Sequence, residues 1–362
     1  MRVLIIFNHP APYKVKVFNE LAKHVDLTVL FERTKERNRP DAFYSNNEYN
    51  FDYIFLKDGY VRDDGSISSK VRDYIKKHHG EYDIIIMNGY SHLAEIKAIR
   101  YMSKHNIKFV LQINGGLIKK ESKLKKAYKT SLINKASYYL SPSRYADEYL
   151  VYYGADRNRI LPYIYTNYSE SEVLKELIKS KDELRDRFNL PKGKRIFVNA
   201  CQFIERKNNI QLISLFKNRD DVLLLVGEGP EKDKYLSYIK ENNMNNVIVL
   251  PFMEKSELFD LLKACDVYIT LSKEDIFGHT TLEAFSNGLP VISSNKVVSS
   301  VEYVKDGYNG YLVSLENDAL IAQKMDEITK SMSIHALESA RNNTFEKNVE
   351  SLLKALGEIY GK

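Results

Sequence analysis

The sequence predicts an α/β protein that contains two parallel-sheet domains. Apolar runs of strand length alternate with helical segments along most of the 362 residues, a pattern typical of parallel sheets covered by helices. This alternation is interrupted once, around residues 163–189, and then begins again. A chain of this length with 44% hydrophobic residues is large enough for two separate cores.

The expected elements of the first domain begin at the N-terminus. Apolar runs of four or five residues predict strands, and helical periodicity predicts the helices between them. The first run leads directly into polar sequence, so it fits a strand and not a signal peptide. The predicted strands are residues 3–7, 27–31, 53–56, 84–87, 109–113 and 138–141, and the predicted helices are residues 13–23, 68–79 and 93–105.

The second domain repeats this pattern after a linker. An irregular stretch, a charged helix over residues 174–188 and the sequence Asn189-Leu190-Pro191 mark the predicted boundary. A last helix, from about residue 343 to 360, is expected to cross back to the first domain. The predicted strands are residues 195–198, 222–226, 247–250, 267–271 and 291–292, with helices at 209–216, from 232, at 255–264 and from 280. The predicted domains are therefore residues 1–165 and 166–342, with the last helix at 343–362.

The stretch from residue 267 to 312 contains the strongest candidate site. Ligands of open parallel sheets bind at the carboxyl ends of the strands, and Asp275 follows one such strand. Glu283 lies eight residues later in the first turn of a helix that begins at Thr280, so both carboxylates can face one ligand. A helix start can also receive phosphate. Alternatively, Thr280 and Glu283 form a capping box, in which Glu283 closes the helix start.

Lys207 is a second candidate, since it follows the predicted strand at residues 195–198. A lysine at this position is either a solvated charge or, if the two strand ends share a site, a cation that stabilises a departing diphosphate. The turn GEGP at residues 227–230 does not fit the spacing of a dinucleotide fingerprint or of a P-loop.

A basic segment lies between Lys119 and Lys135, with seven lysines and one glutamate. Apolar residues recur within it at helical spacing, which indicates a basic amphipathic helix. This helix is either an ordinary solvated face or a surface that attaches to an anionic membrane. No run of eighteen apolar residues occurs, so we expect no membrane-spanning helix.

Other classes of site have little support in the sequence. Cys201 and Cys265 are the only cysteines, which suits a reducing cytoplasm and provides neither a disulfide framework nor a metal cluster. There is no D-x-D motif, and the adjacent pair His78-His79 lacks the spacing of metal ligands. No RNA-binding module is recognisable. We therefore expect no metal, no cofactor and no nucleic-acid partner.

The sequence DIFGHTTLEAFSNGLPVIS at residues 275–293 resembles the signature of glycosyltransferase family 4. These enzymes are retaining sugar-nucleotide transferases of GT-B fold, with two Rossmann-like domains that face a central cleft. Further similarities cover the second domain: FIERK at 203–207 resembles the family's phosphate-binding segment, GEGP its glycine turn, and EYVKDGYNG at 302–310 the end of its motif. In the first domain the resemblance to the family is less specific.

The resemblance implies roles for individual residues. Lys207 would contact the donor diphosphate, Asp275 a sugar hydroxyl and Glu283 the ribose, which makes these three the catalytic candidates. The sequence departs from the family pattern at Asp275, where glutamate is usual, at Gln202, where arginine is common, and at Asn88, where many members have histidine. Donor-binding candidates are Gln202, Gly229, Phe277, Gly278, His279, Thr280 and Glu302, and acceptor-side candidates are Pro12, Tyr13, Asn88, Asn114 and Gly115.

The function implied by the resemblance is a retaining, metal-independent hexosyltransferase. It would move a sugar from a donor such as a UDP- or GDP-sugar to a glycan, glycolipid or glycoprotein acceptor in cell-surface glycoconjugate synthesis. We expect a cytoplasmic location, with attachment to the inner face of the membrane as an option. Because Asp275 and Gln202 depart from the pattern, a non-catalytic GT-B subunit that binds glycan or stabilises a partner transferase is the alternative. A sugar-nucleotide epimerase of the same fold is a third option.

Overall fold

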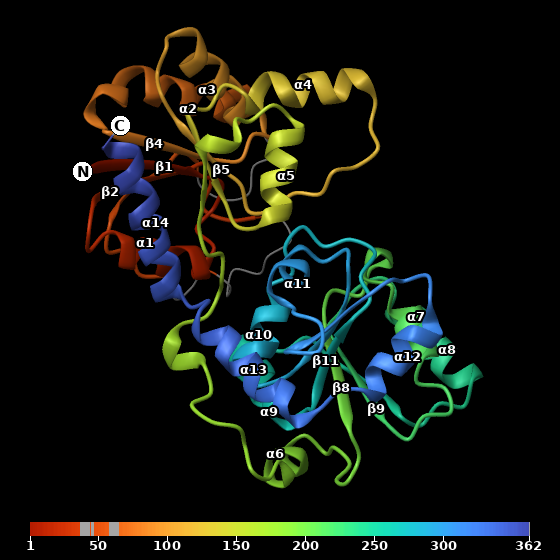
Figure 1. The fold of residues 1–362 in the computed structure, drawn as a ribbon. Helices are drawn as coiled ribbons and strands as arrows, with labels where there is room; N and C mark the ends of the chain where they lie inside the picture. Colours follow the sequence, from red (N-terminus) through yellow and green to blue (C-terminus); the bar gives the residue numbers. More distant parts are fainter. Residues whose placement is uncertain (37–43, 45–46, 58–64, 362) are drawn as a thin grey trace. The chain divides into compact units, whose positions relative to one another are not determined.

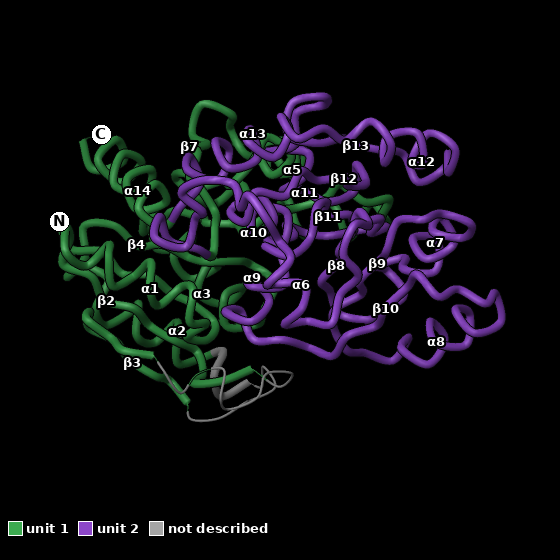
Figure 2. The backbone as a smooth tube through the Cα atoms, turned by 90° about the horizontal axis from the view of Figure 1, so that it is seen from below, with its two compact units in different colours: residues 1–167, 345–362 green, residues 168–344 purple. Residues whose placement is uncertain are grey.

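A computed structural model of the chain describes residues 1–36, 44, 47–57 and 65–361. They form two compact units: Met1–Asn167 together with Phe345–Lys362, and Tyr168–Thr344. Figure 2 distinguishes the two units by colour. Each unit has a parallel sheet and a hydrophobic core of its own.

The first unit contains a seven-stranded parallel sheet in the order β3-β2-β1-β4-β5-β6-β7. The strands are short apolar runs whose side chains are largely buried on both faces, as expected for a sheet covered by helices. Phe7 aligns with Phe31, and Ile6 with Met87, so β1, β2 and β4 end at the same edge. The strands are β1 (Arg2–Phe7), β2 (Asp26–Phe31), β3 (Asp52–Phe55), β4 (Ile84–Asn88), β5 (Val110–Gln112), β6 (Tyr138–Ser141) and β7 (Ile160–Pro162).

The helices of the first unit include the last helix of the chain, α14, which packs against α1 (Figure 1). The Ser351 hydroxyl accepts a hydrogen bond from the Ile164 amide, at 3.0 Å, which adds a contact between α14 and the chain after β7. Pro12 begins α1, where its missing amide hydrogen costs nothing. The helices are α1 (Pro12–Leu21), α2 (Gly65–His78), α3 (Leu93–Lys104), α4 (Lys123–Ile133), α5 (Arg144–Tyr152) and α14 (Phe345–Tyr360).

The second unit contains a six-stranded parallel sheet in the order β10-β9-β8-β11-β12-β13. Strands β8 and β11 are both buried. They are neighbours in the sheet, with Val267 aligned with Phe197, although three helices and two strands lie between them in the sequence. Their carboxyl ends therefore lie side by side. The strands are β8 (Ile196–Ala200), β9 (Val222–Val226), β10 (Val247–Leu250), β11 (Val267–Thr270), β12 (Val291–Ser294) and β13 (Gly310–Val313).

Helices connect these strands, and a 3-10 turn, η5 (Glu205–Lys207), follows β8. The longest helix of this unit, α13, packs against α10. The helices are α6 (Asp182–Arg187), α7 (Asn209–Ser214), α8 (Lys232–Glu241), α9 (Lys255–Ala264), α10 (Thr280–Ser286), α11 (Val298–Tyr303), α12 (Asp318–Asp326) and α13 (Lys330–Arg341).

The helix predicted over residues 174–188 is mostly wrong. Only α6 at its end is helical, and the preceding residues are extended or bent. Tertiary contacts explain the difference: the Leu174 amide donates to the Ser286 carbonyl at 2.9 Å, and the Lys181 ammonium lies 2.9 Å from the Asp266 carboxylate. These contacts hold the segment against the rest of the second unit, and they outweigh its local preference for a helix. Strands β7 and β13 and helices α5, α11, α12 and α13 are additional elements that the sequence analysis did not predict.

Candidate functional site

Lys207 and Asp275 form an ion pair at the carboxyl edge of the second sheet. Lys207 ends η5 after β8, and Asp275 lies in the loop after β11. The Lys207 ammonium contacts Asp275 Oδ2, and both side chains are largely buried, at 12% and 18% exposed. Arg206 Nη1 lies 3.9 Å from the same oxygen. The fold thus brings two of the predicted site residues into direct contact.

The loop that contains Asp275 is fixed to the chain after β12. The Asp275 amide donates to the Lys296 carbonyl at 3.0 Å, and the Ser299 hydroxyl donates to the Gly278 carbonyl at 2.6 Å. Gly278 has φ +85°, and a Cβ there would lie 2.6 Å from Val297 Cγ1. Glycine is therefore required at this position both by conformation and by space.

Phe277 and His279 flank this glycine. Phe277 is buried, and its ring centroid lies 4.9 Å from that of His279. The Ser299 amide donates to the Phe277 carbonyl at 2.8 Å. The predicted donor-binding residues 277–279 thus form one ordered turn that leads into α10.

The start of α10 differs from the predicted capping box. His279 is the N-cap residue and makes no capping hydrogen bond through its side chain, so Thr280 is already the first helical residue. The Thr280 hydroxyl instead lies 2.7 Å from the Tyr268 hydroxyl. Glu283 is buried on the same helix. Since α10 has seven residues, its dipole is small, and Lys207 provides the stronger positive charge at this edge of the sheet.

Tyr268 is a member of this site that the sequence did not reveal. Its hydroxyl is buried, and burial raises its pKa far above the usual value, with smaller contributions from Glu283 and Asp275. The Tyr268 hydroxyl thus connects the end of β8 with the start of α10, since Asn199 lies 3.4 Å and Thr280 lies 2.7 Å from it. A tyrosine within an apolar strand is ordinarily a packing residue, so the sequence held no signal for this position.

Gly229 and Gln202 lie on two segments that pack against each other. The Phe203 amide donates to the Glu228 carbonyl at 2.8 Å. A Cβ on Gly229 would lie 2.4 Å from the Phe203 carbonyl oxygen, so the GEGP turn needs glycine for this approach. Gln202, the residue before Phe203, is exposed at the end of β8.

Residues 302–310, which resemble the end of the family motif, make structural contacts with β12 and β13. The Asp306 carboxylate accepts a hydrogen bond from the Leu312 amide at 2.7 Å, and a Cβ on Gly310 would lie 2.0 Å from the Val291 carbonyl oxygen. Glu302 lies on α11 and is partly buried. The aspartate and glycine of this segment thus shape the β13 turn.

The predicted acceptor-side residues Asn88 and Asn114 are joined in the first unit. Asn114 Nδ2 donates to Asn88 Oδ1 at 3.2 Å, and the Tyr163 hydroxyl donates to Asn114 Oδ1 at 3.2 Å. Lys14 Nζ also donates to Asn114 Oδ1, at 3.4 Å. Lys14 is only 4% exposed, and its burial lowers the pKa of the ammonium from 10.5 to about 7.

Lys14 was missed because a lysine near the start of a surface helix ordinarily faces water. Its position next to the predicted acceptor-side residues Pro12 and Tyr13 is set by α1. Gly115 follows Asn114 with φ +140°. The predicted acceptor-side residues thus lie at the start of α1, at the end of β4 and in the loop after β5, at one edge of the sheet.

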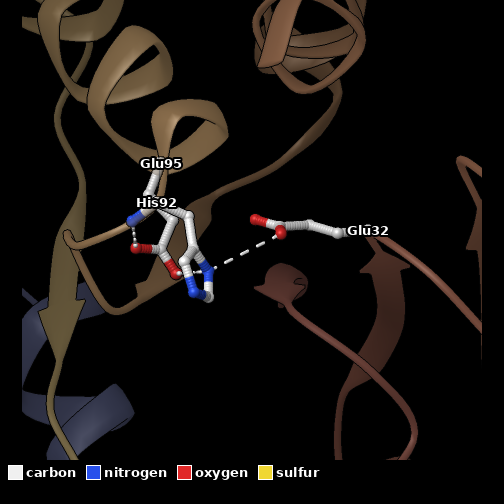
Figure 3. Close-up of side chains that lie close together, drawn as sticks. All are labelled: Glu32, His92 and Glu95. Carbon is white, nitrogen blue, oxygen red and sulfur yellow. Dashed lines mark hydrogen bonds and ion pairs between the residues drawn. The ribbon is translucent and has the colours of Figure 1, made fainter. Parts of the chain in front are cut away.

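A cluster of Glu32, His92 and Glu95 lies at the same edge (Figure 3). His92 Nδ1 lies 3.9 Å from Glu32 and 3.6 Å from Glu95, and both carboxylates are buried. Glu95 also accepts hydrogen bonds from the Ser91 and His92 amides, and Arg33 lies 3.7 Å from Glu32. An imidazole with two carboxylates suits a divalent cation, and it equally suits an ion-pair cluster. The absence of a metal requirement stays a prediction.

Helix α4, Lys123–Ile133, forms the central part of the predicted basic segment 119–135. Leu124 is 85% exposed, and Ile118 and Tyr128 are also exposed. Lys129 differs from its neighbours, since it pairs with Glu121 at 2.8 Å and is mostly covered.

Within the described residues, no helix is long and apolar enough to cross a membrane. The two cysteines, Cys201 and Cys265, are both free thiols.

Comparison with protein families and curated proteins relates the second unit to glycosyltransferases. Residues 180–347 match the family described as glycosyl transferases group 1. An uncharacterized glycosyltransferase of Methanocaldococcus jannaschii is 26% identical over 170 residues, which are 45% of this chain and 48% of that protein. N-acetyl-alpha-D-glucosaminyl L-malate synthase of Bacillus anthracis is 26% identical over 172 residues, 46% and 44% of the two chains. The chain thus spans about half the length of these curated relatives.

Solved structures match nearly the whole chain. HepE of Anabaena, in complex with UDP and glucose, superposes with a TM-score of 0.75 at 16% identity and covers 99% of both chains. The lipopolysaccharide outer core galactosyltransferase WaaB, in its apo form, gives a TM-score of 0.75 at 15% identity and covers 99% of this chain and 100% of that chain. The predicted fold class, GT-B with two Rossmann-like parallel-sheet domains, is confirmed.

Proposed function

We propose that the chain is a retaining glycosyltransferase similar to family 4. It moves a sugar from a nucleoside-diphosphate donor to a glycan, glycolipid or glycoprotein acceptor in cell-surface glycoconjugate synthesis, without a metal ion. The observation that carries this proposal is the contact between Lys207 and Asp275 at the carboxyl ends of β8 and β11. This contact lies within the segment that matches group 1 glycosyltransferases.

The ion pair explains how the site could receive a donor. Its buried cation needs a negative partner, and without a ligand Asp275 provides one. The diphosphate of a donor takes over this role and frees the Asp275 carboxylate to accept hydrogen bonds from sugar hydroxyls. Glu283, buried on the adjoining helix, binds the ribose in this proposal.

The reaction then proceeds at the anomeric carbon. Its bond to the diphosphate oxygen breaks, a bond to the acceptor oxygen forms on the same face, and the acceptor proton passes to the departing diphosphate. Lys207 stabilises the negative charge that develops on the leaving group. Catalysis of this kind rests mainly on positioning and charge stabilisation.

Replacement of Lys207 tests the proposal. With UDP- and GDP-sugars as donors, nucleoside-diphosphate release by Lys207→Ala should be about a hundredfold slower than that of the wild type, as for loss of one charge-stabilising group. The control is Lys194→Ala, because Lys194 precedes β8 at the opposite edge and pairs with exposed Asp220. Unchanged turnover in Lys207→Ala would refute the role of Lys207.

A non-catalytic subunit is the second candidate, and it is motivated by Asp275 and Gln202. In that case the purified chain would neither hydrolyse nor transfer any donor, and millimolar nucleotide sugar, a generous level for a weak site, would not raise its thermal midpoint. A sugar-nucleotide epimerase would convert its donor without an acceptor, which product analysis would detect.

The proposed enzyme works in the cytoplasm at an anionic membrane surface. Support comes from α4 and the segment before it, where exposed lysines surround Leu124 and the exposed residues Ile118 and Tyr128. Such a surface combines charge attraction to anionic headgroups with apolar side chains that can enter the interface. A lipid-linked or glycan acceptor at that surface would be close to the first unit.

A further inference from the structure

If Lys207 were the only cation near Asp275, the charges at this site would disfavour the binding of a diphosphate. Lys207 and Asp275 cancel each other's charge, and Glu283 adds a buried carboxylate nearby. A nucleoside diphosphate brings about two further negative charges to this place. A site with only these three groups would repel it, so another cation has to take part.

Arg206 occupies the right position for that cation. Its guanidinium lies 3.9 Å from Asp275 Oδ2, the oxygen that Lys207 contacts. Nη1 also donates a hydrogen bond to the Glu274 carbonyl at 2.9 Å, which holds the side chain over the loop after β11. The Lys273 amide donates to the Arg206 carbonyl at 2.8 Å, so the backbone is fixed to the same loop.

The Arg206 side chain remains accessible to a ligand. It is 44% exposed, against 12% for Lys207. Its guanidinium has five N–H donors, and the contact with Glu274 is made by one nitrogen. The remaining donors can form the paired hydrogen bonds with phosphate oxygens at which arginine is superior to lysine.

We propose that Arg206 is the second cation of the diphosphate site and supplies the charge that Gln202, exposed at the end of β8, does not. The inference rests on the proposed function and extends it to a residue outside the expected donor-binding set. Arg206 and Lys207 are consecutive on η5, so one turn presents both charges to the ligand.

The test removes the charge of Arg206 and then introduces an arginine at position 202. The probes are UDP and GDP, with inorganic pyrophosphate as a probe that needs no base, and affinity is measured by calorimetry. Arg206→Gln should bind the diphosphates about tenfold or more weakly, as expected for a lost charged hydrogen bond. Adding Gln202→Arg to this variant should restore part of the affinity, because an arginine then returns to the site from β8.

Two controls separate this role from general charge and from folding. Arg187→Gln removes the same charge from α6, where Arg187 pairs with Asp260 and is 57% exposed, and it should not change the affinity. Uridine and guanosine, which lack phosphates, should bind equally to the wild type and to Arg206→Gln. The thermal midpoint of the unliganded Arg206→Gln protein should stay close to that of the wild type.

Three results would overturn the proposal. The first is a wild type that binds UDP or GDP while Arg206→Gln binds it equally well, which would leave the proposed function intact. The second is a lower midpoint of Arg206→Gln together with an affinity that Gln202→Arg does not restore, which would indicate a structural role. The third is a wild type that binds none of the probes, which would overturn the proposed function as well.

Discussion

In the proposed donor site, Asp275 holds the Lys207 ammonium in place by a direct ion pair. Asp275 is one methylene shorter than glutamate, and at this length its carboxylate reaches the Lys207 ammonium directly. Because both groups are mostly covered, removal of either leaves a charge with poor solvation. In the proposed function, a donor that replaces Asp275 as the partner of Lys207 has to offer comparable charge, which a diphosphate does.

Lys14 gives a prediction about pH at the residue scale. Its pKa in the folded chain is about 7, below the usual 10.5, so between these values the unfolded chain binds more protons. The free energy of unfolding should therefore rise with pH from about 7 to about 10.5, by at most about 1.4 kcal/mol per unit from this group. The difference between wild type and Lys14→Met, measured by urea unfolding at pH 7, 8 and 9, should shift steadily in favour of the wild type.

The control for this prediction is Lys16→Met. Lys16 is on the same helix but exposed, so the change with pH should be smaller for Lys16→Met than for Lys14→Met. The groups around the Lys14 ammonium are Asn114 and the Phe7 and Tyr165 rings, which lie 5.6 and 4.2 Å away at their centroids. A constant difference between the wild type and Lys14→Met would show that Lys14 keeps its usual pKa.

At the scale of elements, α4 leads to a prediction about membranes. Replacement of Lys120, Lys123 and Lys125 by glutamine should weaken binding to phosphatidylserine vesicles by about 3 kcal/mol, or about a hundredfold, at roughly 1 kcal/mol per lysine. Vesicle co-sedimentation measures this. Leu124→Ser should weaken binding further, because its side chain is 85% exposed and apolar.

The matched control removes the same charge from the same unit. Lys76 and Lys77 on α2 and Lys104 on α3 are exposed, and their replacement by glutamine should have little effect on vesicle binding. Equal loss in both triple variants would indicate general charge attraction. Equal binding of the wild type to neutral and anionic vesicles would contradict an electrostatic membrane surface.

At the scale of the whole molecule, the proposed chemistry predicts independence from metal ions. The donor diphosphate would be neutralised by the cations of η5, so turnover with a chelator such as EDTA should equal turnover without it. Loss of activity in EDTA that added Mg²⁺ or Mn²⁺ restores would contradict this. The Glu32, His92 and Glu95 cluster would then be the first site to examine, by His92→Ala.

The architecture was largely predictable because strands and most helices are encoded by local patterns. Buried parallel strands need apolar residues in succession, and eleven of the predicted strands correspond to strands of the structure. The prediction of a helix over residues 174–188 was mostly wrong, because contacts with distant residues such as Ser286 and Asp266 override local helix propensity. Strands β7 and β13 were not predicted, because three or four residues give too little periodicity.

The sequence by itself determined the two α/β units, the loops that follow their strands and the residues that resemble a donor site. The tertiary structure alone decided which of these side chains touch. Lys207 and Asp275 are 68 positions apart, Asn88 at the end of β4 contacts Asn114 in the loop after β5, and Lys14 is buried by its neighbours. The physical reason is that strand and helix patterns are local, whereas ion pairs, desolvation and the contact of Arg206 with Asp275 depend on how distant segments pack.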